Sequence, residues 1–504
     1  MPTTLPQVTY DEVNQSQVPP ITLLGVHGLI AQTTFGQTDK PYEVQGLQQW
    51  LDTFGPPSAA CPYFAQIARA LARGVTLWVQ RLLPTGATQS SLALGESLVT
   101  VTAKDFGSWA NGELGIQYTP LAVGVDGVPG TNEIAFTYGP NQNLNETWQA
   151  DSLAALISLV NSQSAIVTIT TAVGFTEPAN TAGNPVFLAG GTDGAFVSAA
   201  TQDTAIAALM PNFDDSTIMP IDTLFVIGNY TLSGYSNLNQ YVLSRLDIMG
   251  IFEIDPTLSP TAAAAFAATM NGVYSEYMAV YWGSLLKAYD PNSNAVGAGP
   301  ILADVAAVWA VSDTIQGNVY SAPAGSRRGT IPNVQTFQYN MLSPAQVLKA
   351  NALVAAGVNI VGSDPTYGPV VWGAQTFYNS GTALDAINVR RILTSLHEQL
   401  MPIYRSELFQ AMDPVTWRDA YTKALVVLNA MVSDSAIYAG FVYVGDQESS
   451  TISDATYNQP NDLANGLYKV QITVVPVGYI YAINVEVDVN NLTTLFNTTA
   501  TITN

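Results

Sequence analysis

Residues able to do chemistry are few in this 504-residue sequence, and their spacing argues against catalysis. The two histidines, His27 and His397, are too few for a three-histidine metal site and leave little room for a histidine-based catalytic triad. His27 stands in an apolar run, so we expect it to fill a core or loop position. His397-Glu398 begins like a metalloprotease helix, but Met401 occupies the position of the second zinc ligand.

Two glycine-rich stretches also lack the spacing that their chemistry would need. The stretch from Gly190 to Gly194 has neither the lysine nor the glycine pattern of a phosphate-binding loop, so it predicts a turn. The stretch from Gly325 to Gly329 places Ser326 among glycines without the Gly-x-Ser-x-Gly pattern of a serine hydrolase. We therefore expect no cofactor and no metal.

Carboxylates are the one plentiful reactive group, with 38 Asp and Glu against 16 Lys and Arg. A pair such as Asp214-Asp215 could serve a glycosidase, and aromatic residues at 10% could line its groove, so an acidic carbohydrate-active enzyme stays as an alternative. The other interpretation is a pair of solvated loop acids before a strand. The formal charge of -22 repels phosphate backbones and anionic lipids, so neither nucleic acid nor direct membrane insertion is expected.

The charges are unevenly distributed along the chain. No Lys or Arg lies between Asp105 and Ser244, where 12 Asp and Glu occur, which indicates a separate unit that faces outward. Nine of the 16 basic residues fall between Arg327 and Lys469, so an anionic partner should meet the chain there.

Two adjacent basic pairs stand out, Arg327-Arg328 and Arg390-Arg391. Each pair is either solvated or paired locally with acids, or it is available to a partner. Arg390 and Arg391 fall in a predicted helix, where neighbours differ by about 100 degrees, so one can serve the fold and the other a partner.

Cys61 is the only cysteine, which excludes an intramolecular disulfide and fits a reducing compartment. The N-terminal segment lacks the basic start and apolar core of a secretory signal, so we expect a cytoplasmic product. The longest uncharged stretch, Ser152 to Thr176, is interrupted by polar residues 161–164 and predicts a helix followed by a strand.

The predicted elements define the fold class as α/β and α+β multidomain: an α/β core, an inserted β-rich domain and extended terminal arms. Alternating strands and helices predict a largely parallel sheet, and Ser259-Pro260 marks the clearest helix start. The predicted core strands are Ile21–Ile30, Val75–Leu82, Leu224–Gly228, Ile251–Ile254 and Tyr277–Tyr281, with a helix at Cys61–Gly74 and another, in the insertion, near Asp151–Val160.

The C-terminal part predicts two helices between Thr382 and Val432, the first bent or ended near Pro402 and the second capped by Asp413. Strands are predicted at Gly440–Val444, Tyr468–Val475 and Tyr479–Val489. The expected domains are an N-terminal arm at 1–20, a core at 21–87 and 201–483 with a C-terminal subdomain at 330–483, an inserted acidic domain at 88–200, and a C-terminal arm at 484–504.

Seven motifs in order resemble those of contractile tail sheath proteins of the myovirus-type phage family. The segment at 320–330 resembles the family's aromatic residue followed by a Pro-Ala-Gly turn, and 387–391 its Val-Asn-Val-Arg-Arg helix start. Two positions depart from the pattern, since Gln375 stands where the family has Arg and Gln7 where it has Gly. The seven motifs are Pro6–Glu12, Lys104–Gly112, Leu188–Gly194, Tyr320–Thr330, Gly368–Thr376, Ile387–Arg391 and Gly466–Pro476.

The resemblance implies a structural protein without enzymatic activity. Sheath subunits stack as hexameric rings around a tail tube, and their contraction drives the tube through the host envelope for genome delivery. The partners implied are further copies of the chain, the tail tube protein, and the baseplate and tail terminator proteins. The location implied is the virion tail, assembled in the host cytoplasm. A tail-derived injection or secretion system is the alternative.

The resemblance also implies linking arms that add strands to a neighbour's sheet. The candidate arm residues are Val8, Tyr10, Glu12, Val485, Val487 and Val489. The candidates to face an acidic tube are Arg390, Arg391, Arg405 and Lys423.

Overall fold

The computed structural model describes residues 25–96, 98–120, 131–290, 296–297, 299–410, 414–443 and 470–480. Its main body is a three-layer α/β unit built on an eight-stranded sheet in the order β18-β17-β13-β12-β11-β1-β3-β2. The strands are β1 (Val26–Ala31), β2 (Tyr42–Val44), β3 (Thr76–Arg81), β11 (Thr223–Val226), β12 (Met249–Glu253), β13 (Met278–Trp282), β17 (Val358–Asp364) and β18 (Gly368–Trp372).

The sheet is parallel except at its two edge strands, β2 and β18, so the predicted parallel sheet is confirmed. Successive side chains of β1 enter opposite cores, Leu29 one and Ile30 the other, as the two-residue period of a strand requires. One face is covered by α1 (Leu47–Thr53), α2 (Phe64–Leu71) and α7 (Leu302–Gln316). The other is covered by α4 (Ala199–Leu209), α5 (Leu232–Arg245), α6 (Pro260–Thr269) and α9 (Val347–Ala355).

Local sequence explains several of these helix ends. The side chain of Ser259 accepts a hydrogen bond from the backbone N–H of Ala262, and Pro260 occupies the first turn of α6, as predicted. Thr231 caps α5 in the same way by accepting from the N–H of Gly234. Helix α7 ends at Gly317, whose φ of 69° is a left-handed conformation that glycine adopts without strain.

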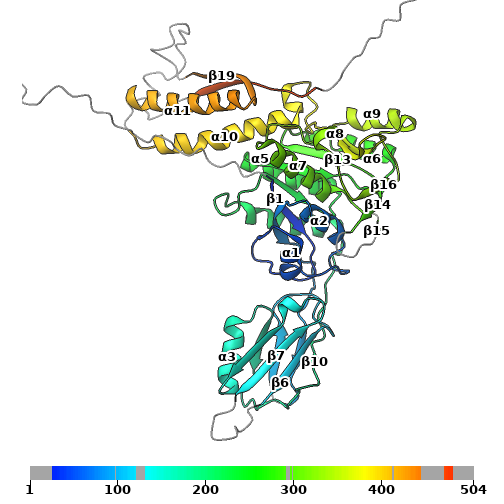
Figure 1. Cartoon of the computed structure of the whole chain (residues 1–504), viewed down its shortest axis with the longest axis vertical. Helices are drawn as coiled ribbons and strands as arrows, with labels where there is room; N and C mark the ends of the chain where they lie inside the picture. The colour runs from blue at the N-terminus through cyan, green and yellow to red at the C-terminus, as the bar shows by residue number, and fades with distance from the viewer. Residues whose placement is uncertain are drawn as a thin grey trace, which may run out of the picture.

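Residues between β3 and β11 form two further sheets with their own hydrophobic core. Helix α3 (Leu153–Gln163) packs on this unit, where the sequence predicted a helix. In Figure 1 the unit lies at the end of the molecule opposite α11. Its strands are β4 (Ser91–Ala93), β5 (Val99–Ala103), β6 (Leu114–Thr119), β7 (Asn132–Tyr138), β8 (Glu146–Ala150), β9 (Val167–Thr171) and β10 (Val186–Phe187).

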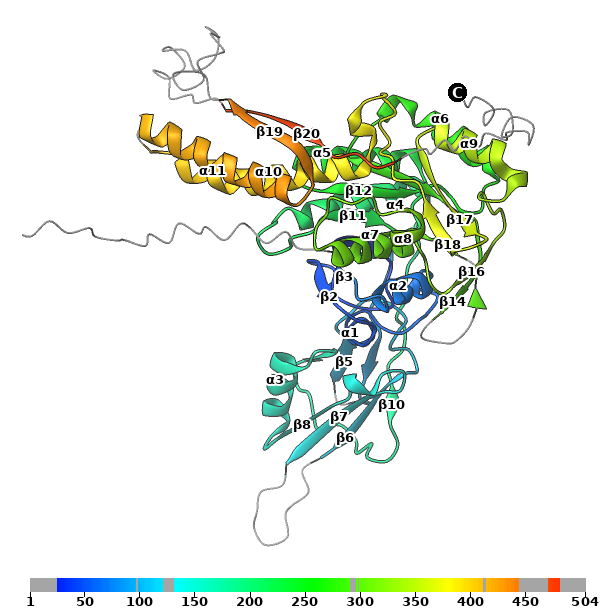
Figure 2. The same cartoon turned by 45° about the horizontal axis from the view of Figure 1, so that its top comes forward.

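A C-terminal lobe projects from the body and contains α10 (Ile387–Glu407), α11 (Pro414–Ser433), β19 (Ile437–Tyr443) and β20 (Gln471–Pro476). Figure 2 shows the lobe extending beyond the main sheet. It has a separate core in which Leu396 and Leu400 of α10 meet Leu428 of α11 and Ile437 of β19.

The structure corrects three boundaries of the C-terminal part. The separate lobe begins at α10 and not at residue 330, because β17 and β18 belong to the main sheet. Helix α10 does not end near Pro402 but continues to Glu407 with this proline inside it, and Leu384 lies in a 3-10 turn before the helix. Tyr479 and Ile480 belong to no strand, and residues 481–489, like the predicted cap Asp413, lie outside the described residues.

The remaining short elements connect these units. The strands β14 (Leu285–Tyr289), β15 (Val296–Gly297) and β16 (Val334–Phe337) form a small sheet, and α8 is Gly325–Arg328. The 3-10 turns are Gln142–Leu144, Met210–Phe213, Asn271–Val273, Pro344–Gln346 and Ala383–Asp385.

Candidate functional site

Helix α10 joins the body to the lobe and carries the Arg390-Arg391 pair. Its first residue, Ile387, packs in the core of the body, whereas the residues from Ile392 onward pack in the core of the lobe. Figure 2 shows the helix running from the main sheet into the projecting lobe. The arginine pair therefore lies where the two units meet.

Arg391 is buried in this junction and forms a two-pronged ion pair with Asp313 of α7. Its Nη1 and Nη2 lie 2.7 Å and 2.5 Å from the two carboxylate oxygens. The guanidinium also stacks 4.9 Å from the centre of the Trp309 ring. Burial raises the pKa of Asp313, although the charge of Arg391 opposes the rise. Arg391 thus holds α10 on the body and presents no free cation.

Arg390 also makes its contacts within the subunit. Its guanidinium lies 4.2 Å from the centre of the Tyr277 ring and 4.0 Å from the carboxylate of Glu276. The residue is only 9% exposed, and burial lowers its pKa. Both arginines therefore serve the fold, and the hypothesis that one of them meets a tube has no support in the geometry of the free subunit.

The other two predicted tube-facing residues lie in the lobe. Lys423 of α11 is paired with Glu407 at 2.6 Å and with Asp419 at 2.5 Å, so its charge is neutralised. Arg405 is exposed in the last turn of α10 and has no ion pair within the described part of the chain. Arg405 is the member of the predicted set that keeps an available positive charge.

The β19–β20 ribbon is a second candidate surface. Val442 and Ile472 face each other across the ribbon and pack toward the lobe core. The opposite face exposes three large apolar side chains: Tyr438 is 71% exposed, Phe441 63% and Val475 47%. Among the described residues, neither outer edge of the ribbon pairs with a further strand. Within the part of the chain that the structure describes, the ribbon is therefore open on one face and along both edges.

The sequence did not predict this apolar face, because Tyr438 and Phe441 are three residues apart and would lie on opposite faces of a regular strand. An irregularity between Ile437 and Ala439 brings both side chains to the open face. The predicted arm residues Val8, Tyr10, Glu12, Val485, Val487 and Val489 all lie outside the described part of the chain.

Residues that could have done chemistry have structural contacts instead. His27 is fully buried, its Nδ1 lies 2.6 Å from Oγ1 of Thr223, and burial lowers its pKa to about 3. Asp215 accepts hydrogen bonds from Thr217 in an exposed loop, and Asp214 accepts one from the hydroxyl of Tyr241. His27 therefore has the predicted core role, and the Asp214-Asp215 pair consists of loop acids.

The described ranges of the chain contain no cluster of three or more His, Cys, Asp or Glu side chains arranged to hold a metal ion. They also contain no helix that is both long and apolar enough to span a membrane.

A group of partly buried acids lies beside Arg391 at the junction of α10 and the body. Burial raises the pKa of Glu398 to about 7, and the neighbouring charge of Asp247 adds to the rise. Burial also raises the pKa of Asp222 well above its ordinary value. Asp222, Asp247 and Glu398 line one small cavity together with Arg391, so the junction is sensitive to protonation.

Comparison with known proteins extends the resemblance found in the sequence. No family model matches the chain. The tail sheath protein of Vibrio phage KVP40 is 27% identical to it over 159 residues, which cover 32% of this chain and 23% of that relative. The match thus spans about a quarter of the length of the curated relative.

Two solved structures share the fold over nearly the whole chain. The sheath tail protein of Listeria innocua superposes with a TM-score of 0.58 at 14% identity, covering 90% of this chain and 95% of that one. The contracted PVC sheath complex of an extracellular contractile injection system gives a TM-score of 0.56 at 13% identity, covering 98% and 99%. The resemblance to contractile tail sheath proteins is therefore confirmed in sequence and in fold.

Proposed function

We propose that this chain, which has the fold of contractile tail sheath proteins, is a structural sheath subunit that polymerises around a tail tube and contracts. The observation that carries the proposal is the extent of the fold match, which covers 98% of this chain and 99% of a subunit from a contracted sheath complex. A match of this extent includes body, acidic unit and lobe together, which a shared α/β core alone would not produce.

The ribbon of the lobe explains how subunits link. An extended arm can add to the open edge of β19 or β20 through backbone hydrogen bonds, and the apolar side chains of the arm can pack on the exposed face around Phe441. The arms at 1–20 and 484–504 supply the segments, with Val8, Tyr10 and Glu12 in one and Val485, Val487 and Val489 in the other. Such a link preserves connectivity while the bodies rotate against one another.

The charge distribution supports a proposed orientation of the subunit in the assembly. The acidic unit at 88–200 faces outward, and the lobe faces the tube, where Arg405 offers a positive charge to an acidic tube surface. Assembly on the tube holds the sheath in a higher-energy packing, and relaxation of that packing supplies the work of contraction without a nucleotide.

The biological setting proposed is a phage tail, because the curated relative is a phage tail sheath protein. The partners are further copies in stacked hexameric rings, the tail tube protein, and the baseplate and tail terminator proteins. The sheath would drive the tube through the host envelope for genome delivery. An injection system is the second candidate, because one of the solved structures with this fold comes from such a system.

Electron microscopy of the purified chain tests the proposal. We expect ring stacks or hollow tubes from the full chain, and only monomers after deletion of residues 1–18, because the N-terminal linking strand is then lost. A matched control deletes the last four residues, 501–504, which contain none of the predicted arm residues. A full chain that stays monomeric with or without a tube protein would contradict the proposal.

A further inference from the structure

A groove of about 930 Å³ opens on the body beside the edge strand β18. Its walls are α8, α9 and the ends of β17 and β18, and Val347, Val354 and Trp372 supply apolar surface. Trp372 is 43% exposed and Val347 47%, so large apolar side chains face solvent there. The volume lies at the upper end of the range for binding pockets, which suits a peptide segment.

The positive charge of the groove lacks a counterion. Arg327 and Arg328 both line it, and neither has an ion pair or hydrogen bond with the described part of the chain. The Nε of Arg328 is buried without a hydrogen-bond partner. In a chain with 38 acidic residues, two adjacent unpaired arginines at an apolar groove favour an occupant that carries carboxylates.

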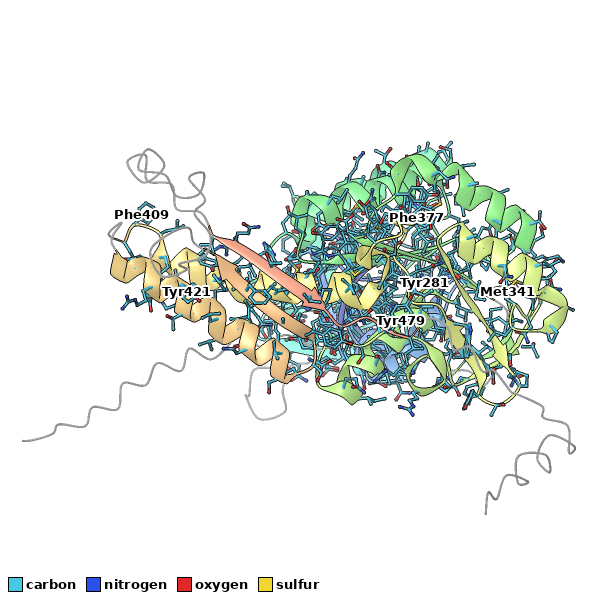
Figure 3. The ribbon with its side chains drawn as sticks, turned by 90° about the horizontal axis from the view of Figure 1, so that it is seen from above. Tyr281, Met341, Phe377, Phe409, Tyr421 and Tyr479 are labelled. Atoms are coloured by element: carbon cyan, nitrogen blue, oxygen red, sulfur yellow. The ribbon has the colours of Figure 1, made fainter. Side chains whose placement is uncertain are left out.

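The chain itself leads into the groove. After β20, Val477 donates a backbone hydrogen bond to the carbonyl of Ala436 and accepts one from the side chain of Asn388. Tyr479 and Ile480 then form part of the groove wall. Figure 3 shows Tyr479 where the chain after β20 reaches the body, near Tyr281. The described part of the chain therefore ends, at Ile480, in the wall of the groove.

The next nine residues match the groove in character. Residues 481–489 read Tyr-Ala-Ile-Asn-Val-Glu-Val-Asp-Val, which alternates apolar side chains with Asn484, Glu486 and Asp488. An extended segment of this length spans roughly 30 Å and presents its apolar and acidic side chains on opposite faces. When the segment lies between the two walls of the groove, its apolar face can cover the wall of α9 and Trp372. Its acidic face then approaches Arg327 and Arg328 of α8.

We propose that in the free subunit residues 481–489 dock into this groove of their own body. Attachment at Ile480 gives the segment an effective concentration on the order of millimolar, well above that of a second copy in dilute solution. Docking covers an apolar strand that would otherwise be open to aggregation. It also withholds Val485, Val487 and Val489 from a neighbour's sheet until assembly, a consequence that rests on the proposed function.

Disulfide trapping tests the docking. Val347→Cys lies in the groove wall, and a second cysteine is placed in turn at Ile483, Val485 and Val487. Cys61 can stay, because it is buried and burial raises the pKa of its thiol to about 12. With oxidised glutathione as the oxidant, which is reduced as the two thiols are joined, we expect an intramolecular disulfide at micromolar protein, seen as a mobility shift of a species that keeps the mass of a monomer.

The matched control is Leu348→Cys, which lies on the same helix, is 85% exposed and is not part of the groove wall. The best Val347 pair should form its disulfide at least about tenfold faster than the same tail cysteine paired with residue 348. Equal rates at both positions would overturn the proposal. Dimers linked between chains would also overturn it, because they would identify a second copy as the occupant.

Charge reversal tests the role of the arginines. Arg327→Glu with Arg328→Glu should lower the rate of disulfide formation about two- to fivefold, the size expected for partly exposed ion pairs. Lys349→Glu is the matched control on α9, because Lys349 is not part of the groove wall. If the double variant has the circular dichroism of the parent and an unchanged rate of disulfide formation, Arg327 and Arg328 do not attract the segment. That result would overturn the proposal.

The outcome separates this inference from the proposed function. Tubes from a chain that forms no intramolecular disulfide would reject the docking and keep the sheath function. A disulfide in a chain that never forms tubes would keep the docking and reject the function. If both hold, oxidation of the Val347 pair should block tube formation and reduction should restore it.

Discussion

The eight-stranded sheet of the body and the β19–β20 ribbon of the lobe differ in how completely their apolar faces are covered. Both faces of the large sheet are covered by helices, and its central residues, such as Tyr281 and Trp282, are fully buried. The ribbon is covered on one face by the lobe core and leaves Tyr438 and Phe441 in solvent. A two-stranded ribbon is marginal by itself. The difference is between a sheet that is covered on both faces and a ribbon that keeps one open face, which is the surface the proposed linking arms would cover.

The ion pairs follow the same division. In the body, Arg69 meets Asp304, and at the junction Arg391 of α10 meets Asp313, and all four side chains are nearly inaccessible. In the lobe, the ion pairs of Lys423 with Glu407 and Asp419 are partly exposed, and Arg405 has no such partner among the described residues. Each unit should therefore respond differently to the same kind of substitution, and four predictions follow in order of their effect on subunit stability.

Arg391→Ala should have the largest effect, a loss of about 3–5 kcal/mol in the free energy of unfolding. The substitution leaves the carboxylate of Asp313 buried without its partner. Urea titration followed by tryptophan fluorescence measures the loss, because Trp309 lies beside the ion pair. The double variant Arg391→Met with Asp313→Leu should recover most of it, since no unpaired charge remains. A loss below about 1 kcal/mol for Arg391→Ala would place the pair among weak surface contacts.

Glu398→Gln should have the next largest effect. It should change only the pH dependence of the free energy of unfolding. The pKa of Glu398 is about 7 in the folded chain, above its ordinary value of 4.5, so the folded state holds the proton over that interval. Stability therefore falls as the pH rises from about 4.5 to 7, by up to about 3 kcal/mol. Glu398→Gln should flatten this slope, and an unchanged slope would reject the assignment.

The measurement for Glu398 is urea unfolding at steps between pH 5 and pH 8. Glu253→Gln is the comparison inside the body, since burial raises the pKa of Glu253 to about 8. Its carboxylate accepts a hydrogen bond from the backbone N–H of Ile301, which the Gln side chain can also accept. That variant should change the slope up to pH 8, whereas Glu398→Gln should change it only to about pH 7.

Phe441→Lys should change subunit stability by less than about 0.5 kcal/mol, because the side chain is largely exposed, yet prevent tube formation. A lysine on the open face of the ribbon would have to be desolvated when an arm packs there. Electron microscopy and thermal unfolding measure the two effects. Thr473→Lys, directly opposite Phe441 on the same face, is a second variant with the same expected result. Normal tubes from both variants would show that assembly leaves this face uncovered.

Arg405→Glu should have the smallest effect on stability and a specific effect on association. The exposed side chain has no ion pair to lose within the described residues. Docking to an acidic tube should slow, most clearly at low salt. Stopped-flow light scattering with tube protein measures the rate, and Lys349→Glu on the body is the control. Equal rates for both variants at low salt would move the tube contact away from Arg405.

Local patterns in the sequence predicted much of the body and little of the junction. The capped start of α6 at Ser259 and the parallel strands follow from residue types a few positions apart. The partner of Arg391 could not be found in this way, because Asp313 lies 78 positions earlier and is brought close only by the packing of α7 on α10. The alternation of apolar and polar residues predicts a strand, but it does not predict which surface the strand contacts. Tyr479 was therefore predicted in a strand, although it lies in the wall of the groove.

Helix α10 has a mechanical consequence. The helix is continuous for 21 residues, about 31 Å, and includes Pro402. Its first residue packs in the core of the body, and the residues from Ile392 onward pack in the core of the lobe. A force that a neighbour exerts on the ribbon would be transmitted along α10 to the body. The ion pair of Arg391 with Asp313 would resist separation of α10 from the body. Body and lobe of one subunit should therefore rotate together as a rigid unit. The flexible parts of the assembly would be the links between subunits.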